Sequence, residues 1–321
     1  MGKRIRLCPE ITDPYLRSFL NTVPAIRSFQ SELAKGQELS GQTCTIPLDG
    51  REITVCIHKA GGEGAHPVVF EFHGGGFILG DAEKDDKICE KISRTLCCHV
   101  IGVNYRLAPE HPYPAAFNDA YDVIVYFKEH ASEYGIDVNQ MAVMGYSGGA
   151  TLATAVAMRC RKEGDFSLCA QVLHYPYLDS VHMPQEKEHY DCDMDPEVMR
   201  AFTVLYSKEE ERSIPYVSPV CASAEDLAKT APACILPAEK DALKEEGLLY
   251  AQKLKEAGVP VYCQIMPDTH HGYVEDAGNE PVYMAGAEDT RSHHSPYFRV
   301  WANAALDITC TFLRQQFESE N

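Results

Sequence analysis

Short apolar runs alternate with longer amphipathic segments from about residue 51 onward. Ile53, Val55 and Ile57 alternate with polar positions, which is typical of a strand with one buried face. Further strand-like runs cover residues 68–72, 99–104, 141–144, 169–175, 233–237 and 259–266. Helix-like segments occupy residues 84–96, 114–132, 148–161, 243–257 and 298–317. Strands that alternate with helices in this way predict an α/β fold, a mostly parallel sheet with helices on its faces.

Three stretches fall outside this alternation. Residues 1–40 are amphipathic and helix-like, and residues 181–215 are charged and aromatic, with a helical piece near residues 196–207. We expect both to form a cap over the functional site; the alternative is a helix packed on the flank and a surface excursion. Residues 274–296 form an irregular stretch that is longer than a usual connection. Because no internal repeat or low-complexity linker is visible, we expect residues 1–321 to form one domain.

The composition limits the classes of partner. The 321 residues are 45% hydrophobic, which is enough to bury a large core. They include 47 acidic and 29 basic residues, a net charge of −18, which argues against nucleic acids and anionic membrane surfaces as partners. No window reaches the roughly 18 consecutive apolar residues that a membrane span needs. We also see no secretory signal near the N-terminus.

The 13 cysteines are scattered, without a CxxC pair or a repeated spacing. This predicts reduced thiols in a cytoplasmic protein rather than a disulfide framework. Cys56, Cys234 and Cys263 lie in apolar, strand-like contexts, where cysteine behaves as a small hydrophobic residue. A redox or metal-binding role for the adjacent Cys97 and Cys98 is the alternative. The prediction is that the protein holds no metal.

The segment Gly-Tyr-Ser-Gly-Gly at residues 145–149 directly follows the strand-like run at residues 141–144. It has the G-x-S-x-G pattern of a nucleophile elbow, a tight turn from a strand into a helix that exposes the serine hydroxyl. Small residues around Ser147 let the backbone turn without a Cβ clash. Because five residues match by chance in many unrelated proteins, the remaining motifs decide the meaning of this one.

A second motif, His-Gly-Gly-Gly-Phe at residues 73–77, directly follows the strand-like run at residues 68–72. Consecutive glycines after a strand allow backbone N–H groups to turn toward a ligand. A phosphate-binding loop is the rival interpretation, but neither G-x-x-x-x-G-K-[ST] nor G-x-G-x-x-G is present. An HGGG-type motif upstream of a G-x-S-x-G elbow indicates the oxyanion hole of an acyl-transfer enzyme.

A serine nucleophile needs a base to take its proton and a carboxylate to orient that base. His271 follows the strand-like run that ends at residue 266 and is our choice for the base, ahead of its neighbour His270. Asp241 follows an apolar strand-like run and is our choice for the acid, ahead of Glu239. Asp268 is close enough in sequence to contact the His271 loop, but we expect it to act as a cap. Loops at the carboxyl ends of parallel strands are where sites form in α/β sheets.

Three segments together resemble the hormone-sensitive lipase family of α/β-hydrolase carboxylesterases. They are the HGGG motif, the run Val-Asn-Tyr-Arg-Leu-Ala-Pro-Glu-His-Pro-Tyr-Pro-Ala-Ala at residues 103–116, and the region from Asp241 to His271 and the following glycine. The resemblance covers roughly residues 50–272 and the final helix. It implies an α/β-hydrolase fold with an eight-stranded sheet, a helical cap built partly from the N-terminus, and no cofactor.

Carried over residue by residue, the resemblance makes Ser147 the nucleophile, Asp241 the acid and His271 the base. It also implies that the N–H groups of three glycines form the oxyanion hole: Gly75, Gly76 and Gly148. The elbow departs from the family's usual Gly-Asp-Ser-Ala-Gly-Gly, because Tyr146 replaces the acidic neighbour of the serine and Gly148 replaces the alanine. Neither departure changes the three triad residues.

These observations predict a serine carboxylesterase that hydrolyses short-chain acyl esters of small molecules through an acyl-enzyme. We expect aromatic side chains near the motifs to wall the substrate pocket, with core positions as the alternative for each: Phe77, Tyr113, Tyr146, Tyr175, Tyr177 and Tyr273. An amidase or peptidase of the same fold is the second interpretation, and a non-catalytic ligand receptor on a hydrolase fold is the third. The presence of His271 argues against a receptor. Whether the chain forms a homo-oligomer is left open.

Overall fold

The computed structural model describes residues 12–36, 38–190, 194–278 and 295–319. Most of the irregular stretch at 274–296, and the first 11 residues of the expected cap, therefore lie outside the described residues. In the described part of the chain, one sheet has eight strands in the order β1-β2-β4-β3-β5-β6-β7-β9. Its strands are β1 (Gln42–Leu48), β2 (Arg51–His58), β3 (His66–Phe72), β4 (His99–Val103), β5 (Ile136–Tyr146), β6 (Ala170–His174), β7 (Ala233–Leu236) and β9 (Val261–Cys263).

The sheet is antiparallel at one edge and parallel through the rest. β2 runs antiparallel to both β1 and β4, whereas the pairs from β4 through β3, β5, β6 and β7 to β9 are all parallel. A separate parallel pair joins β8 (Ala238–Lys240) to β10 (Met266–His270). The predicted mostly parallel α/β sheet with eight strands is confirmed.

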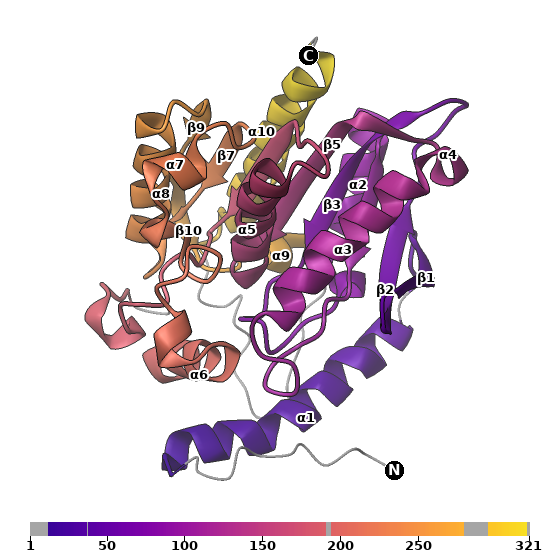
Figure 1. The fold of residues 1–321 in the computed structure, drawn as a ribbon. Helices are drawn as coiled ribbons and strands as arrows, with labels where there is room; N and C mark the ends of the chain where they lie inside the picture. The colour runs from indigo at the N-terminus through magenta and orange to yellow at the C-terminus, as the bar shows by residue number, and fades with distance from the viewer. Residues whose placement is uncertain (1–11, 37, 191–193, 279–294, 320–321) are drawn as a thin grey trace.

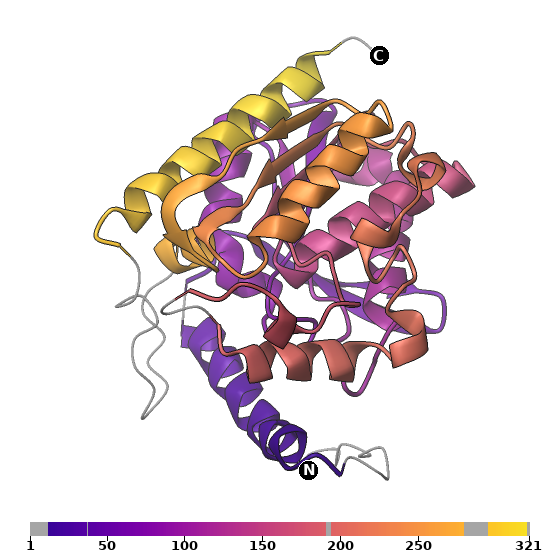
Figure 2. The same ribbon diagram turned by 90° about the vertical axis from the view of Figure 1, so that its left-hand side faces the viewer.

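Helices cover both faces of the sheet. On one face pack α3 (Ala115–Glu129), α5 (Gly148–Glu163) and α8 (Lys244–Glu256), and on the other α2 (Asp86–Leu96), α9 (Tyr273–Gly278) and α10 (Phe298–Glu318) (Figures 1 and 2). The shorter helices are η1 (Ala82–Asp85), α4 (Ala131–Tyr134), η2 (Pro184–Glu186), η3 (Glu209–Glu211), η4 (Pro219–Cys221) and α7 (Ala224–Leu227). None of the described helices is both long and apolar enough to cross a membrane.

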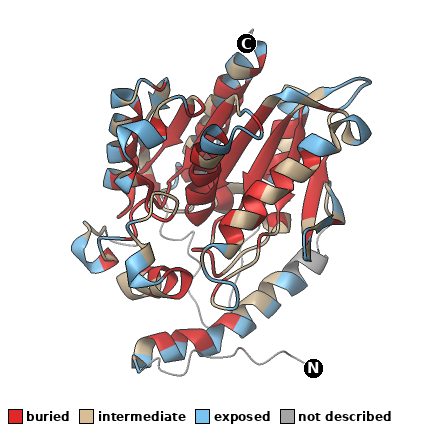
Figure 3. Cartoon of the chain, viewed as in Figure 1, coloured by how far each residue is buried: buried red, intermediate tan, exposed pale blue. Residues whose placement is uncertain are grey.

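The strand alternation explains how the two apolar layers form. Val68 and Phe70 of β3 pack on the face covered by α3 and α5, while Val69 between them packs on the face of α2 and α10. Figure 3 shows that most of each central strand and most of α5 is buried. Continuous apolar runs, rather than alternating ones, are what parallel strands with both faces covered require.

One strand prediction needs correction, and one strand of the eight-stranded sheet was missed. The predicted strand at 259–266 is divided, because β9 pairs with β7 whereas β10 pairs with β8. Pro237 lies between β7 and β8 and has no N–H for the ladder, so the pairing changes there. β1 was not predicted: it is an edge strand with mostly exposed or half-buried residues, so it carries little hydrophobic signal.

The two expected cap segments lie against each other at the end of the sheet where β5 ends (Figures 1 and 2). α1 (Pro14–Gly36) buries Leu16, Phe19, Leu20 and Val23, which share one helical face. The Phe19 ring packs edge-on against Phe202 of α6 (Pro196–Tyr206), with 5.7 Å between centroids. The N-terminal helix is thus held by the second irregular segment.

Candidate active site

Ser147 occupies the single-residue turn between β5 and α5. Its φ of 51° lies in the left-handed region, which is unfavourable for a residue with a Cβ and is characteristic of the elbow. The glycines around it allow the tight approach of strand and helix. A Cβ on Gly145 would lie 2.3 Å from the Gly149 carbonyl oxygen, and a Cβ on Gly149 would lie 2.0 Å from that of Phe72.

Ser147 is hydrogen-bonded in series to His271 and Asp241. Ser147 Oγ lies 2.9 Å from His271 Nε2, and His271 Nδ1 lies 2.9 Å from Asp241 Oδ2. Asp241 is buried and its other oxygen accepts a hydrogen bond from the Leu243 N–H at 2.9 Å. With Nδ1–H donating to the carboxylate, Nε2 is left to accept the serine proton. The arrangement can therefore generate a serine nucleophile.

The alternative acids and base are placed differently. Glu239 accepts a hydrogen bond from the Asp268 N–H, and the Asp268 carboxylate pairs with Lys240. These contacts hold the β8–β10 pair together beside the site. The histidine that bonds to both serine and aspartate is His271 rather than its neighbour His270.

The glycine motif forms a tight loop after β3. The Ile78 and Leu79 N–H groups both donate to the Gly75 carbonyl oxygen, and Gly75 and Gly76 have φ values of 119° and 61°. A Cβ on Gly75 would lie 2.2 Å from the Leu79 carbonyl oxygen, and a Cβ on Gly76 would lie 2.1 Å from Phe202 Cδ2. Both positions therefore require glycine for conformational and steric reasons.

His73 supports this loop from inside the protein. Its ring stacks on Tyr105 with 4.2 Å between centroids, and the Tyr105 hydroxyl donates to the His73 carbonyl oxygen at 2.7 Å. Burial, and then the nearby Lys84 cation, lowers the pKa of His73 to about 3, so the ring is neutral. Its Nδ1–H donates to the Gly74 carbonyl oxygen at 2.8 Å. His73 therefore fixes the loop and is not a second base.

A family model described as an α/β hydrolase fold matches residues 69–275. The chain is an α/β-hydrolase of the hormone-sensitive lipase family. This hydrolase is 38% identical over 218 residues to Esterase LipI of Mycobacterium tuberculosis, covering 67% of this chain and 68% of the relative. It is 35% identical over 219 residues to an arylesterase of Saccharolobus solfataricus, covering 67% of this chain and 71% of the relative.

A solved structure agrees with this assignment. The thermostable esterase of Pseudomonas putida superposes on this α/β-hydrolase with a TM-score of 0.79 at 25% identity, covering 96% of this chain and 98% of the other. The resemblance expected from the sequence motifs is confirmed at the level of the family.

A cavity opens directly above Ser147 in this α/β-hydrolase. Its walls come from the glycine loop, the hydrogen-bonded serine, histidine and aspartate, α6 and the segments on either side: Gly76, Ser147, Tyr177, Met194, Met199, Phe202, Asp241, Leu243 and His271. It leaves about 20 Å³ for the centres of water-sized molecules, which is room for one or two waters. The cavity is thus narrow and largely apolar at Ser147.

Only Tyr177 among the expected aromatic walls lines this cavity. Phe77 is buried and stacks on Tyr206 with 3.7 Å between centroids. Tyr146 precedes the serine on β5, so its side chain points to the other face of the sheet, where it stacks on His174. Three site predictions are therefore corrected to core positions: Phe77, Tyr146 and Tyr273.

The cavity residues that sequence reasoning missed come mainly from the expected cap. Met199 and Phe202 lie three residues apart on α6 and face the same side, next to Met194. This spacing in the helical segment at 196–207 indicates from the sequence alone that the two side chains share one face of a helix. The spacing does not show that α6 lies over Ser147, because that position depends on contacts between residues distant in sequence.

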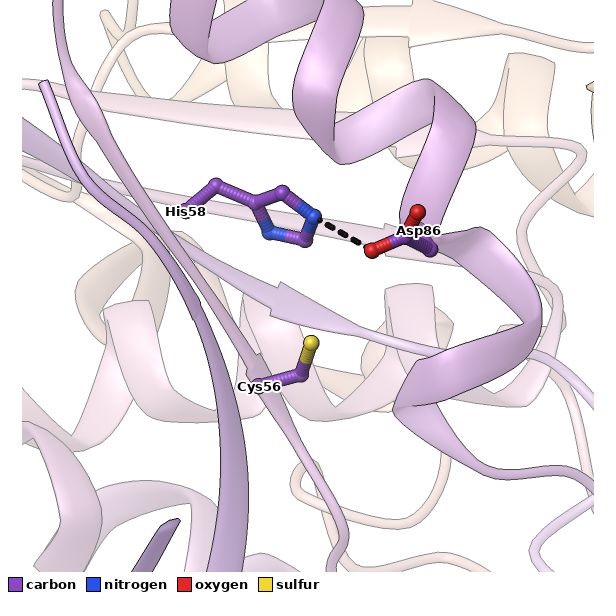
Figure 4. A group of neighbouring side chains, drawn as sticks. All are labelled: Cys56, His58 and Asp86. Atoms are coloured by element: carbon purple, nitrogen blue, oxygen red, sulfur yellow. Dashed lines mark hydrogen bonds and ion pairs between the residues drawn. The ribbon is translucent and has the colours of Figure 1, made fainter. Parts of the chain in front are cut away.

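Within the described part of the chain, one group resembles a set of metal ligands: Cys56, His58 and Asp86, whose ligand atoms all lie within 4.8 Å of one another (Figure 4). Asp86 already accepts hydrogen bonds from the Ser40 and Gly41 N–H groups and lies 2.9 Å from His58 Nε2. A Cβ on Gly41 would lie 2.6 Å from Cys56 Sγ and 2.8 Å from His58 Nε2, so the backbone fills the space between the side chains. Burial raises the pKa of Cys56 to about 12, which keeps the thiol protonated. This group anchors residues 40–41 to α2.

Proposed function

We propose that this α/β-hydrolase is a serine carboxylesterase for short-chain acyl esters, with Ser147 as nucleophile, His271 as general base and Asp241 as its orienting acid. The observation that carries the proposal is the chain of two 2.9 Å hydrogen bonds from Ser147 through His271 to Asp241. The names of the relatives, an esterase and an arylesterase, support the same reaction class.

The geometry supports a two-step mechanism. Ser147 Oγ attacks the ester carbonyl carbon while His271 Nε2 takes the hydroxyl proton, and Asp241 stabilises the resulting imidazolium. The carbonyl electron pair becomes an oxyanion, for which we propose the N–H groups of Gly75, Gly76 and Gly148 as donors. Collapse breaks the bond to the alkoxide, which leaves with the proton from His271.

Deacylation repeats these steps with water. His271 takes a proton from the water that attacks the acyl carbon, and Ser147 leaves as the serine hydroxyl with that proton. No residue outside the proposed triad is required to transfer a proton, and no cofactor enters the scheme.

The cavity supports the restriction to short acyl groups. Met199, Phe202 and Leu243 close the space around Ser147, so a long acyl chain would have to displace one of these side chains. Truncating Phe202 removes the largest of these walls, so the acyl preference depends on α6.

A chain-length series tests this function. The wild type should hydrolyse p-nitrophenyl acetate or butyrate with the highest kcat/KM, should lose activity on the octanoate, and should leave acetanilide intact. Phe202→Ala should move the preference toward the octanoate. Faster turnover of the octanoate than of the acetate by the wild type would contradict the short-chain assignment, and faster turnover of the amide would indicate an amidase.

The proposed location is the cytoplasm. It is supported by free cysteines in the apolar core, such as Cys89 and Cys234, which act there as small hydrophobic side chains.

A further inference from the structure

A buried carboxylate lies directly behind the glycine loop. Glu275 belongs to α9, four residues after His271, and is buried. Glu275 Oε1 accepts a hydrogen bond from the Gly74 N–H at 3.3 Å, and Oε2 accepts one from the Tyr175 hydroxyl at 3.1 Å. One side chain thus contacts the loop that precedes Gly75 and an aromatic ring beside the triad.

Lys84 completes this arrangement. Its ammonium forms an ion pair with Glu275 and lies 3.4 Å from the Gly74 carbonyl oxygen, to which it donates. Gly74 is therefore held at both its N–H, by Glu275, and its carbonyl oxygen, by Lys84 and His73. A Cβ on Gly74 would lie 2.9 Å from Glu275 Oε1, so glycine is what allows the carboxylate to come this close.

The same carboxylate reaches the base through Tyr175. The Tyr175 ring packs edge-on against the His271 ring, with 5.0 Å between centroids and an interplanar angle of 65°. Glu275 therefore bridges the two loops that must be in register: the one that offers N–H groups to the oxyanion, and the one that carries the base.

Two further buried acids, Glu71 and Asp85, lie near the Lys84–Glu275 ion pair. Burial, and then the charge of Asp85, raises the pKa of Glu71 well above its usual range, and burial does the same for Asp85. Burial alone would lower the pKa of Lys84, but Glu275 and Asp85 outweigh it and raise the pKa. The Lys84 ammonium and the Glu275 carboxylate are the directly paired groups in this cluster, whose other two acids, Glu71 and Asp85, both have raised pKa values.

We propose that Glu275, held by Lys84, is a positioning residue that fixes the Gly74 peptide so that the N–H groups of Gly75 and Gly76 face the oxyanion. This inference rests on the proposed ester hydrolysis. It adds two residues to the site that no motif contains, one on η1 and one on α9.

The test compares Glu275→Ala, Glu275→Gln and Lys84→Met with the wild type on p-nitrophenyl acetate, with the concentration of active sites titrated by a fluorophosphonate. For Glu275→Ala we expect kcat per active site to fall about 10–100-fold with KM nearly unchanged, because misplaced groups cost rate rather than ground-state binding. Glu275→Gln keeps an oxygen for the Gly74 N–H and should recover part of the loss. Lys84→Met should fall between the two.

A trifluoromethyl ketone inhibitor separates positioning from general damage. It adds to Ser147 and places an oxyanion in the hole, so its Ki should rise by the factor by which kcat/KM falls. Asp86→Ala is the matched control, because Asp86 is also a buried carboxylate that accepts backbone N–H bonds, but from Ser40 and Gly41. This variant should lose stability while its active fraction keeps the wild-type Ki.

One result would contradict the positioning role of Glu275, and a different result would contradict the esterase function itself. An active Glu275→Ala fraction with wild-type kcat and wild-type Ki would overturn the positioning role and leave the esterase intact. A wild-type protein that neither hydrolyses the acetate nor binds the ketone would overturn the proposed function, and the positioning role with it.

Discussion

The Phe202 ring lies so close to Gly76 that a Cβ on Gly76 would be 2.1 Å from Phe202 Cδ2. This contact joins α6 to the glycine loop, although the two are more than 100 residues apart in sequence. Gly76 and Phe202 both line the cavity above Ser147. The wall of the acyl site and the proposed oxyanion loop are thus parts of the same packing arrangement.

Gly76→Ala should therefore reduce catalysis sharply. The new methyl group must displace Phe202 or the loop, and the Gly76 φ of 61° is unfavourable for alanine. We therefore expect kcat to fall by about 10²–10³, which is the effect of losing one oxyanion donor. Steady-state kinetics on p-nitrophenyl acetate measures this. The matched control is Gly50→Ala, with a similar φ of 68° but no atom within 4 Å of the new Cβ. Equal activity losses in both variants would assign the effect to backbone strain instead.

Asp241→Asn should lower kcat by about 10³–10⁴ with little change in stability. An amide at 241 can still accept the Leu243 N–H, but it no longer provides the negative charge that holds the His271 imidazolium. Glu239→Gln is the comparison, since Glu239 is exposed and contacts the Asp268 N–H rather than His271. The kcat of Glu239→Gln should stay near that of the wild type. A larger loss of kcat in Glu239→Gln than in Asp241→Asn would instead assign Glu239 as the acid that orients His271.

Tyr146→Phe and Tyr146→Asp should behave very differently. Among the residues that the structure describes, the Tyr146 hydroxyl bonds only to Met144 Sδ, at 4.0 Å, so phenylalanine should cost less than about 1 kcal/mol of unfolding free energy. Burial, and then the nearby carboxylate of Asp85, raises the pKa of Tyr146 well above its usual value. An aspartate there would add an unpaired acid to a buried acidic cluster and should cost about 3–5 kcal/mol.

Urea unfolding of the two Tyr146 variants measures these differences. The family's usual residue at this position is aspartate. The loss of stability predicted for Tyr146→Asp therefore arises from the buried acidic side chains around residue 146 in this chain. A stable and active Tyr146→Asp variant would show that the cluster accommodates another carboxylate.

Asp86 should make stability fall at acidic pH. Burial alone would raise its pKa, but the Ser40 and Gly41 N–H groups and His58 outweigh burial and lower the pKa to about 2, from the ordinary 3.8. A lowered pKa in the folded state contributes stability above pH 3.8 that is lost as the pH falls toward 2, an effect of about 2 kcal/mol.

Wild type and Asp86→Asn should accordingly differ most in unfolding free energy near neutral pH and converge between about pH 4 and pH 2. Denaturant titrations at several pH values give this difference. A gap that stays constant down to pH 2 would mean that the Asp86 carboxylate contributes through packing alone.

Much of the candidate site's geometry could be predicted from the sequence because its constraints are local. Gly145 and Gly149 must be small for β5 to turn directly into α5, and Asp241 and His271 each follow closely on a strand. These features leave a mark in a few consecutive residues. For the same reason, the alternation of apolar runs and amphipathic segments predicted which strands and helices follow one another along the chain.

The substrate cavity could not be predicted in the same way. Phe202 reaches the site only because α6 packs against α1, and no nearby residue indicates that contact. Tyr146 was placed in the pocket because it adjoins Ser147 in sequence, although adjacent residues on a strand point to opposite faces. Glu275 was invisible because its role depends on reaching Gly74, 201 residues away.

The central claim is that Ser147 is the nucleophile of an esterase. Treating the protein with a fluorophosphonate and mapping the adduct by peptide mass spectrometry tests it most directly, with loss of p-nitrophenyl acetate hydrolysis followed in parallel. We expect a single adduct on Ser147 whose extent matches the activity lost, and neither adduct nor activity in Ser147→Ala. An adduct on another residue, or a Ser147→Ala variant that still hydrolyses the ester at the wild-type rate, would contradict it.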